Sequence, residues 1–188
     1  MSRPKVPHNR GHTREIADSL RRERPDLDPT DYLYLIYANR VGRLLQAVDD
    51  KHCRTEFGMS AADMRVLFAL RRAGPSYALR PTELFRALLV TSGAITKQVD
   101  RLAAGGYVAR QPGPAKSGGY LIHLTAKGFK VADDALTSLV HSSVMSINTL
   151  TAAERSQVCV LLEKMLGDLE GRLETGEESK DGPEAQAA

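Results

Sequence analysis

The sequence predicts a mainly α-helical fold with one small β-hairpin. Long segments with apolar residues at helical spacing lie on both sides of the middle of the chain, where two short helices and two β-prone runs follow one another. At 188 residues, with 42% apolar and 26% charged residues, the composition is that of one globular domain with tails. Only 5% of the residues are aromatic and tryptophan is absent, which argues against the stacking platforms of RNA-binding and single-strand-binding proteins.

Residues 1–27 are polar and basic, and we expect them to form a partly disordered N-terminal arm. Ile16 and Leu20 have the spacing of one short helix behind Thr13. His8 and His12 lie four residues apart, but a proline and a glycine interrupt the segment and no acidic or thiol ligand lies nearby. We therefore predict no metal site in the arm.

A long helix is expected to begin at Asp28 and Pro29, a capping residue followed by proline in the first turn, and to end at Gly58. Its apolar residues recur at helical spacing, which predicts that one face of the helix is buried. The residues of this face are Leu33, Ile36, Tyr37, Val41, Leu44, Leu45 and Val48.

The same helix carries candidate residues for binding a small molecule. Tyrosines near a helix start are usually packing residues, but Tyr37 beside Arg40 is also suited to an aromatic anion. The next helix is opened by Ser60 and Asp63 and carries Arg65, a candidate to bind the carboxylate of such an anion. These three residues, Tyr37, Arg40 and Arg65, form the predicted effector site.

Two short helices then follow with a tight turn between them. Pro81 is suited to the first position of one helix, with Glu83 at its positively polarised end, and this helix should run to about Leu89. Thr91 is a good N-cap for the second helix, and the glycines at 105 and 106 end it.

The second of these helices has two distinct faces. Ile95, Val99 and Leu102 fall on one face, which predicts burial. The opposite side is polar and built of small residues and bases, and we expect it to face water or a partner: Ser92, Gly93, Thr96, Lys97 and Arg101.

Residues 107–110 and 120–124 are short β-prone runs around a proline- and glycine-rich loop, the pattern of a hairpin with a long tip. Residues 59–124 thus have the order of a winged helix-turn-helix domain. Residues 80–130 contain eight bases and two acids, a local charge of +6 against +3 for the chain. We predict that this domain binds duplex DNA, with the helix in the major groove and bases on phosphates. The alternative is a winged-helix module that docks onto proteins without sequence-specific DNA binding.

The C-terminal third of the chain continues as helices. Thr125 is expected to cap one helix, and Thr151 with Glu154 forms a capping box that opens another. The apolar stripe of this last helix extends to Leu173. We predict that residues 28–58 and 125–173 form a helical dimerisation region, and that residues 174–188 form an acidic disordered tail.

The motifs LRPTEL (79–84), TSGAITKQVDRLAAGGYVAR (91–110) and LIHLTAKG (121–128) resemble those of the MarR family of transcriptional regulators. The resemblance covers about residues 29–173. It implies a homodimer that binds a palindromic operator, usually as a repressor, and that a small aromatic or phenolic acid, or its thioester, releases from DNA.

The resemblance also implies site residues. Asp100 would brace the wing through a basic partner, and the tip departs from the family because it lacks the usual arginine, which leaves Lys116 as a point charge. Together with the basic residues of the helix and hairpin, the predicted DNA-binding residues are Arg80, Thr82, Ser92, Gly93, Thr96, Lys97, Arg101, Arg110 and Lys116.

Signals of other functions are missing from the sequence. It has no GxSxG, HExxH or strand-linked GxGxxG motif, so we predict neither an enzyme nor a cofactor. Cys53 and Cys159 have no metal-binding spacing. His52 beside Cys53 is compatible with redox sensing, but a buried, unreactive thiol is the preferred interpretation.

The sequence contains no apolar stretch long enough to span a membrane and no signal peptide, which predicts a cytoplasmic protein.

Overall fold

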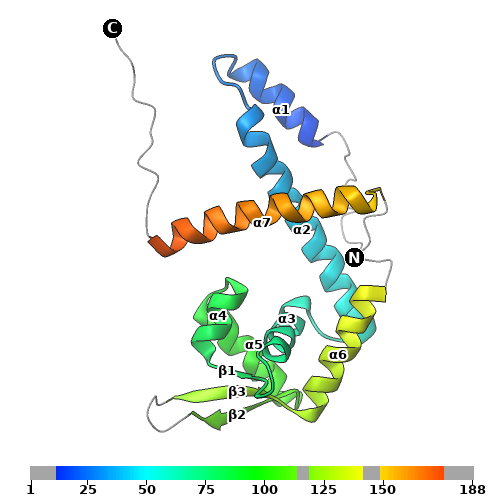
Figure 1. The fold of residues 1–188 in the computed structure, drawn as a ribbon, viewed down its shortest axis with the longest axis vertical. Helices are drawn as coiled ribbons and strands as arrows, with labels where there is room; N and C mark the ends of the chain where they lie inside the picture. The colour runs from blue at the N-terminus through cyan, green and yellow to red at the C-terminus, as the bar shows by residue number, and fades with distance from the viewer. Residues whose placement is uncertain (1–11, 114–118, 142–148, 176–188) are drawn as a thin grey trace, which may run out of the picture. The chain divides into compact units, whose positions relative to one another are not determined.

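The computed structural model describes residues 12–113, 119–141 and 149–175. The chain divides into two compact units, residues 1–145 and 146–188. Among the described residues, the second unit contains one helix, α7 (Ala152–Thr175). The first unit contains six helices and three strands (Figure 1): α1 (His12–Glu23), α2 (Thr30–Phe57), α3 (Ala61–Arg72), β1 (Ala78–Leu79), α4 (Pro81–Leu88), α5 (Ser92–Ala104), β2 (Val108–Pro112), β3 (Tyr120–Leu124) and α6 (Ala126–His141). The predicted fold class, mainly α with a small β-wing, is confirmed.

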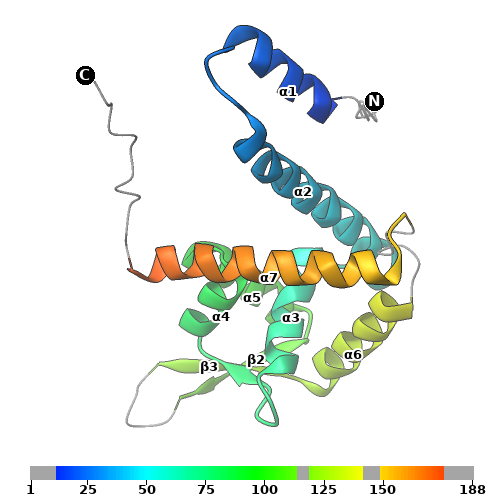
Figure 2. The ribbon, with the colours of Figure 1, turned by 45° about the horizontal axis from the view of Figure 1, so that its top comes forward.

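The short helix predicted in the N-terminal arm is present in the structure. Helix α1 has twelve residues and begins at His12, before the expected cap at Thr13. It lies along the N-terminal part of α2 (Figures 1 and 2), and Ala17 is buried. Burial of one face against α2 stabilises a helix too short to persist alone. His8, half of the histidine pair considered above, lies outside the described residues.

Helix α2 begins and ends as predicted. The Asp28 carboxylate accepts hydrogen bonds from the Thr30 amide (2.9 Å) and hydroxyl (2.6 Å), and Gly58 ends the helix with φ = 67°. However, the predicted burial of its apolar face is wrong within this chain: Tyr37, Val41, Leu44, Leu45 and Val48 are 36–55% exposed. Helical spacing indicates that one face of a helix is apolar, but it does not identify the surface that covers this face.

The core of the first unit lies between α3, α4, α5 and the sheet (Figure 2). Each of these elements contributes fully buried side chains at the positions that its helical or strand spacing selects. The largest are Met64, Leu67, Leu70, Leu84, Ile95, Val99, Leu102 and Ile122, all at most 2% exposed. This core fixes the position of α5, whose inner face is predicted correctly.

The sheet has three strands rather than the two predicted. β1 pairs with β3, which in turn pairs with β2, all antiparallel. Ala78 lies opposite His123, so the segment before α4 is tied to the wing. The wing tip, residues 114–118 with the predicted site residue Lys116, lies outside the described residues.

The turn between α4 and α5 follows the predicted capping residues. The Thr91 hydroxyl accepts a hydrogen bond from the Ala94 amide (3.3 Å), and Gly106 adopts φ = 73° after α5. Leu89 ends α4 in a left-handed conformation (φ = 52°) and is 75% exposed. A leucine rarely adopts this conformation, so the turn holds local backbone strain.

Helix α6 begins where the wing meets α5. The Thr125 hydroxyl accepts from the Gly128 amide (3.0 Å) and lies 2.8 Å from the carbonyl oxygen of Gly106. The Thr125 amide donates to the carbonyl oxygen of Tyr107 (3.1 Å). A Cβ atom at Gly128 would lie 2.0 Å from that same oxygen. Glycine is therefore required at this close approach.

Helix α7 of the second unit begins with the predicted capping box. The Thr151 amide donates to the Glu154 carboxylate (2.7 Å), and the Glu154 amide donates to the Thr151 hydroxyl (3.3 Å). Its large apolar side chains from Val158 to Leu173 are exposed, except for the half-buried Met165. Within the described residues, no helix combines the length and the apolar character needed to cross a bilayer.

Candidate nucleic-acid interface

The outer face of α5 is an exposed polar surface of the winged domain. Ser92, Gly93, Thr96 and Lys97 are all exposed, as predicted, and the Thr96 hydroxyl donates to the Ser92 carbonyl oxygen (3.0 Å). Among the described residues, the Lys97 ammonium group has no ion-pair or hydrogen-bond partner. A small-residue helix face with one unpaired cation can approach a duplex closely, because little side-chain bulk stands between the helix and the groove.

Arg101 lies on the same helix, but its side chain is paired with another residue of the same domain. Its guanidinium group makes two contacts with the Asp63 carboxylate of α3, Nη2 to Oδ1 at 2.7 Å and Nε to Oδ2 at 3.3 Å. The Asp63 side chain is only 11% exposed. The hydrogen bond from Asp63 raises the pKa of Arg101 further above its usual value. This bidentate pair fixes α5 against α3.

The wing is braced against α5 by a second ion pair. The Arg110 guanidinium of β2 donates to the Asp100 carboxylate of α5, and its Cζ atom lies 5.5 Å from the centre of the Tyr120 ring on β3. The brace that the family resemblance implied for Asp100 is thereby confirmed. Because α5 and both long strands meet at this pair, helix and wing are linked as one surface.

Two further bases serve the domain internally. The Lys127 ammonium donates to the Gly105 carbonyl oxygen at the end of α5 (2.8 Å) and lies 4.2 Å from the centre of the Tyr107 ring. Lys130 pairs with Asp134 (2.7 Å). A cation at a helix C-terminus satisfies the last carbonyl groups and the helix dipole. Among the described residues, the bases of residues 80–130 without an ion pair are Arg80, Arg86, Lys97 and Lys127, and of these Lys127 is bound to a backbone carbonyl group.

The segment that opens α4 places two predicted residues near the same surface. The Arg80 amide donates to the Glu83 carboxylate (2.6 Å), which fixes the first turn of α4, and Thr82 is exposed in that turn. The Arg80 side chain is half-buried. Both residues are positioned at a helix N-terminus, where a phosphate oxygen would find free amide groups.

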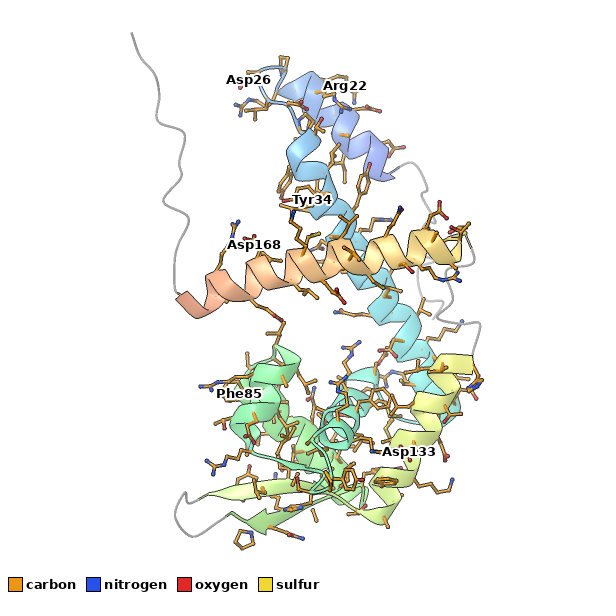
Figure 3. All side chains as sticks on the ribbon, in the orientation of Figure 1. Arg22, Asp26, Tyr34, Phe85, Asp133 and Asp168 are labelled. Atoms are coloured by element: carbon orange, nitrogen blue, oxygen red, sulfur yellow. The ribbon has the colours of Figure 1, made fainter. Side chains whose placement is uncertain are left out.

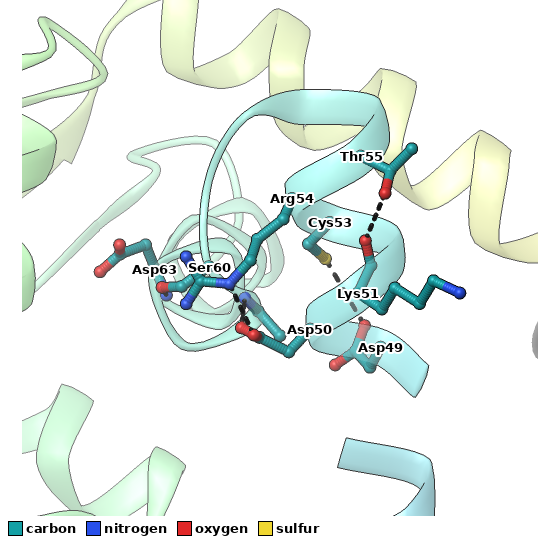
Figure 4. A network of polar contacts seen from close by, with 9 residues as sticks. Asp49, Asp50, Lys51, Cys53, Arg54, Thr55, Ser60 and Asp63 are labelled. Carbon is teal, nitrogen blue, oxygen red and sulfur yellow. Dashed lines mark hydrogen bonds and ion pairs between the residues drawn. The ribbon is translucent and has the colours of Figure 1, made fainter. Parts of the chain in front are cut away.

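A network of polar contacts connects the end of α2 to the start of α3 (Figure 4). Asp50 accepts from the Arg54 guanidinium (2.7 Å) and from the Ala61 amide at the start of α3 (3.0 Å), and these bonds lower the pKa of Asp50. Asp49 pairs with Arg65 of α3 (2.9 Å). Since Asp63 on α3 binds Arg101, α3 has polar contacts with both α2 and α5.

The predicted effector residues have different surroundings in the structure. Arg65 is paired with Asp49, while Arg40 lines a pocket between α1 and α2. Tyr37 lies one turn before Arg40 on α2, is exposed and does not line that pocket. The effector site therefore stays a prediction.

Sequence reasoning missed Asp63 and Lys127 as positioning residues. It assigned Asp63 only to the start of α3, because its partner Arg101 lies 38 positions away. Sequence spacing alone does not identify such a pair. However, a single acidic residue among the apolar positions of α3 indicates that a basic partner lies near it in the folded chain.

Cys53 has the character of a structural thiol. It is 1% exposed, and its sulfur atom donates to the Asp49 carboxylate (3.5 Å). Burial, together with the negative charge of Asp49, raises the pKa of Cys53 to about 12. A thiol in this state is a poor nucleophile, since the thiolate is the reactive form.

In a Cys159→Ser variant, we expect the remaining Cys53 to react slowly with a disulfide reagent at neutral pH. The rise of the pKa from its ordinary value to about 12 lowers the thiolate fraction by roughly a thousandfold. Stopped-flow measurement with 5,5′-dithiobis(2-nitrobenzoate) checks this, and the same variant in denaturant provides the fast reference. A rate in the folded protein equal to that of the unfolded chain would contradict the assignment.

Taken with the exposed face of α5, the fold defines a winged helix-turn-helix protein. The model of the MarR family matches residues 57–116. The multiple antibiotic resistance protein MarR of Escherichia coli is 33% identical over 134 residues, which cover 67% of this chain and 90% of that protein. The transcriptional repressor NicR of Pseudomonas putida is 30% identical over 149 residues, covering 76% of this chain and 92% of that protein.

The solved structures agree with these relatives. The crystal structure of a mutant E. coli MarR complexed with operator DNA has a TM-score of 0.58 and 29% identity, and the match covers 71% of this chain and 96% of that chain. The chain therefore belongs to the MarR family of transcriptional regulators. Membership confirms the prediction of a regulator rather than an enzyme.

Proposed function

We propose that this protein is a homodimeric repressor that binds a two-fold symmetric duplex operator through α5 and is released by a small organic anion. The observation that carries the proposal is the outer face of α5, with small exposed residues and Lys97 unpaired. The relatives supply the regulatory context, since one is named as a repressor and another was solved with operator DNA.

Each proposed DNA contact follows from its place on the surface. Ser92, Gly93, Thr96 and Lys97 read base edges in the major groove, since they form the exposed N-terminal part of α5. Arg80 and Thr82 hold phosphate at the start of α4. Lys116 lies outside the described residues and is proposed as a phosphate contact from its charge alone. Arg101 and Arg110 contribute positive potential while paired with Asp63 and Asp100.

Dimerisation is supported by the apolar surfaces that the chain leaves open. The apolar stripe of α2, defined by Tyr34, Tyr37, Val41, Leu44 and Val48, is 39–55% exposed, and Tyr34 projects from α2 in Figure 3. Helix α7 exposes a second apolar set: Val158, Leu161, Leu162, Leu166, Leu169 and Leu173. Exposed apolar surface of this extent marks protein interfaces. A second copy of the same chain is the partner that makes two α5 helices available for successive major grooves.

The test is selection of bound fragments from genomic DNA, followed by footprinting of the enriched site. We expect a two-fold symmetric sequence whose half-sites lie about one helical turn apart, with affinity that falls as salt rises. If affinity for duplex DNA did not depend on salt and the protein instead formed a stable complex with another polypeptide, the protein-docking alternative would be favoured.

A further inference from the structure

A single leucine is exposed in the turn between α4 and α5. Leu89 is 75% exposed, whereas its neighbours Leu88 and Val90 are partly buried and pack against the core of the winged domain. The turn is therefore seated on the domain by the residues on both sides of Leu89. Only the middle one of three consecutive apolar side chains is directed into solvent.

The backbone of this turn keeps the Leu89 side chain outside. The Leu89 amide donates to the Arg86 carbonyl oxygen (3.3 Å), and the Val90 amide donates to the Phe85 carbonyl oxygen (3.1 Å). These hydrogen bonds close α4 and hold Leu89 in the left-handed conformation, with φ = 52° and ψ = 46°. Glycine is the usual residue at such a position, because a Cβ atom makes the conformation unfavourable. Leucine therefore lowers stability here through its backbone, and it also leaves apolar surface in water.

The exposed leucine lies beside the part of α5 that is proposed to read bases. Thr91, the N-cap of α5, is two positions further along the chain, and Ser92 and Gly93 follow it on the exposed surface. Two residues of chain span at most about 7 Å. Leu89 is thus continuous with the N-terminal end of α5, the end that enters the major groove in helix-turn-helix proteins.

The charges on either side of Leu89 indicate the kind of partner. Arg86, three positions earlier, and Lys97 of α5 are both exposed, and neither has an ion pair among the described residues. Charged residues are depleted at the apolar centre of protein interfaces, so this surface fits a protein partner poorly. A DNA duplex supplies both complements, since its phosphates attract the cations and the C5-methyl group of thymine is an apolar contact in the major groove.

We propose that Leu89 contacts the C5-methyl group of one thymine in each half-site of the operator and thereby contributes to sequence specificity. The contact removes the apolar surface of both groups from water only when DNA is bound, which gives a role to a leucine that destabilises the free protein. The inference rests on the proposed function for the entry of α5 into the major groove. Leu89 is not among the DNA-binding residues predicted from the sequence.

The experiment combines a change in the protein with removal of the methyl group from the DNA. A duplex enriched by selection from genomic DNA is prepared with each symmetric pair of thymines replaced in turn by uracil, which lacks only the methyl group. We expect one replacement to lower wild-type affinity about 10- to 20-fold, because loss of one buried methyl group changes affinity roughly fourfold at each of two half-sites. Leu89→Gly should bind the thymine duplex with a similarly lowered affinity and should lose nothing further on that replacement.

Two comparison variants separate this contact from changes in folding. Leu89→Met keeps an apolar side chain and should remain sensitive to the same uracil replacement. Val140→Ala shortens another exposed apolar side chain, which is 79% exposed on α6, and should bind both duplexes as the wild type does. The melting temperature of Leu89→Gly should not fall below that of the wild type, since glycine favours the left-handed conformation.

Wild-type affinity of Leu89→Gly for the thymine duplex would overturn the inference. Uracil replacements that weaken the wild type and Leu89→Gly equally at every position would also overturn it, because another residue would then read the methyl groups. In both cases the duplex is still bound, so the proposed function remains. If selection enriched no duplex, the proposed function would fail and the contact of Leu89 with thymine would fail with it.

Discussion

Replacement of Lys97 by alanine is expected to reduce operator affinity by about 10- to 100-fold, since each subunit loses one charged contact with the duplex. Lys97 is the described base of α5 without an internal partner, so its removal leaves the contacts among α3, α5 and the wing unchanged. The logarithm of affinity should also fall less steeply with salt, because the dimer loses two positive charges at the surface of the duplex. Fluorescence anisotropy across a series of salt concentrations measures both quantities.

An Arg72→Ala variant provides the control for loss of one positive charge, because Arg72 is exposed on α3 rather than on α5. We expect it to lower affinity only slightly. If Lys97→Ala bound with wild-type affinity and salt slope, α5 would not be the element that contacts DNA. The melting temperatures of both variants should match the wild type, which separates binding from folding.

Replacement of Gly128 by alanine is expected to destabilise the fold by about 3 kcal/mol or more. The added Cβ atom would lie 2.0 Å from the Tyr107 carbonyl oxygen and 2.9 Å from its carbon atom, so α6 must move away from the base of the wing. That movement breaks the hydrogen bonds between Thr125 and Tyr107. Thermal unfolding should show a melting temperature lowered by roughly 6–12 °C, given two to four degrees per kcal/mol for a chain of this size.

Gly42→Ala is the matched comparison for this substitution. A Cβ atom at Gly42 in α2 meets nothing within 4 Å, so alanine there should raise stability slightly through its higher helix propensity. Both proteins are to be compared at the same concentration. Equal melting temperatures for Gly128→Ala and the wild type would show that α6 and the wing accommodate the methyl group without strain.

The local features of this fold could be predicted because their signals lie within a few residues. Pro81, Thr91 and Gly106 each have a conformational preference that fixes a helix start or end, and the structure has these boundaries within one or two residues. The inner face of α5 was predictable for the same reason, since three apolar positions at helical spacing select one side.

Features that depend on distant partners were missed. β1 has only two residues, Ala78 and Leu79, so it has no periodic pattern, and its pairing with β3 is set by the folded domain. The ion pair of Arg65 with Asp49, sixteen positions earlier, was missed for the same reason. The apolar face of α2 was predicted from its spacing, but its exposure within one chain was not, because helical spacing does not identify the surface that covers a face.

The exposed apolar stripe of α2 has a consequence for the behaviour of the protein in dilute solution. If a second copy of the chain covers this stripe, the melting temperature should rise with protein concentration, because association stabilises only the folded chain.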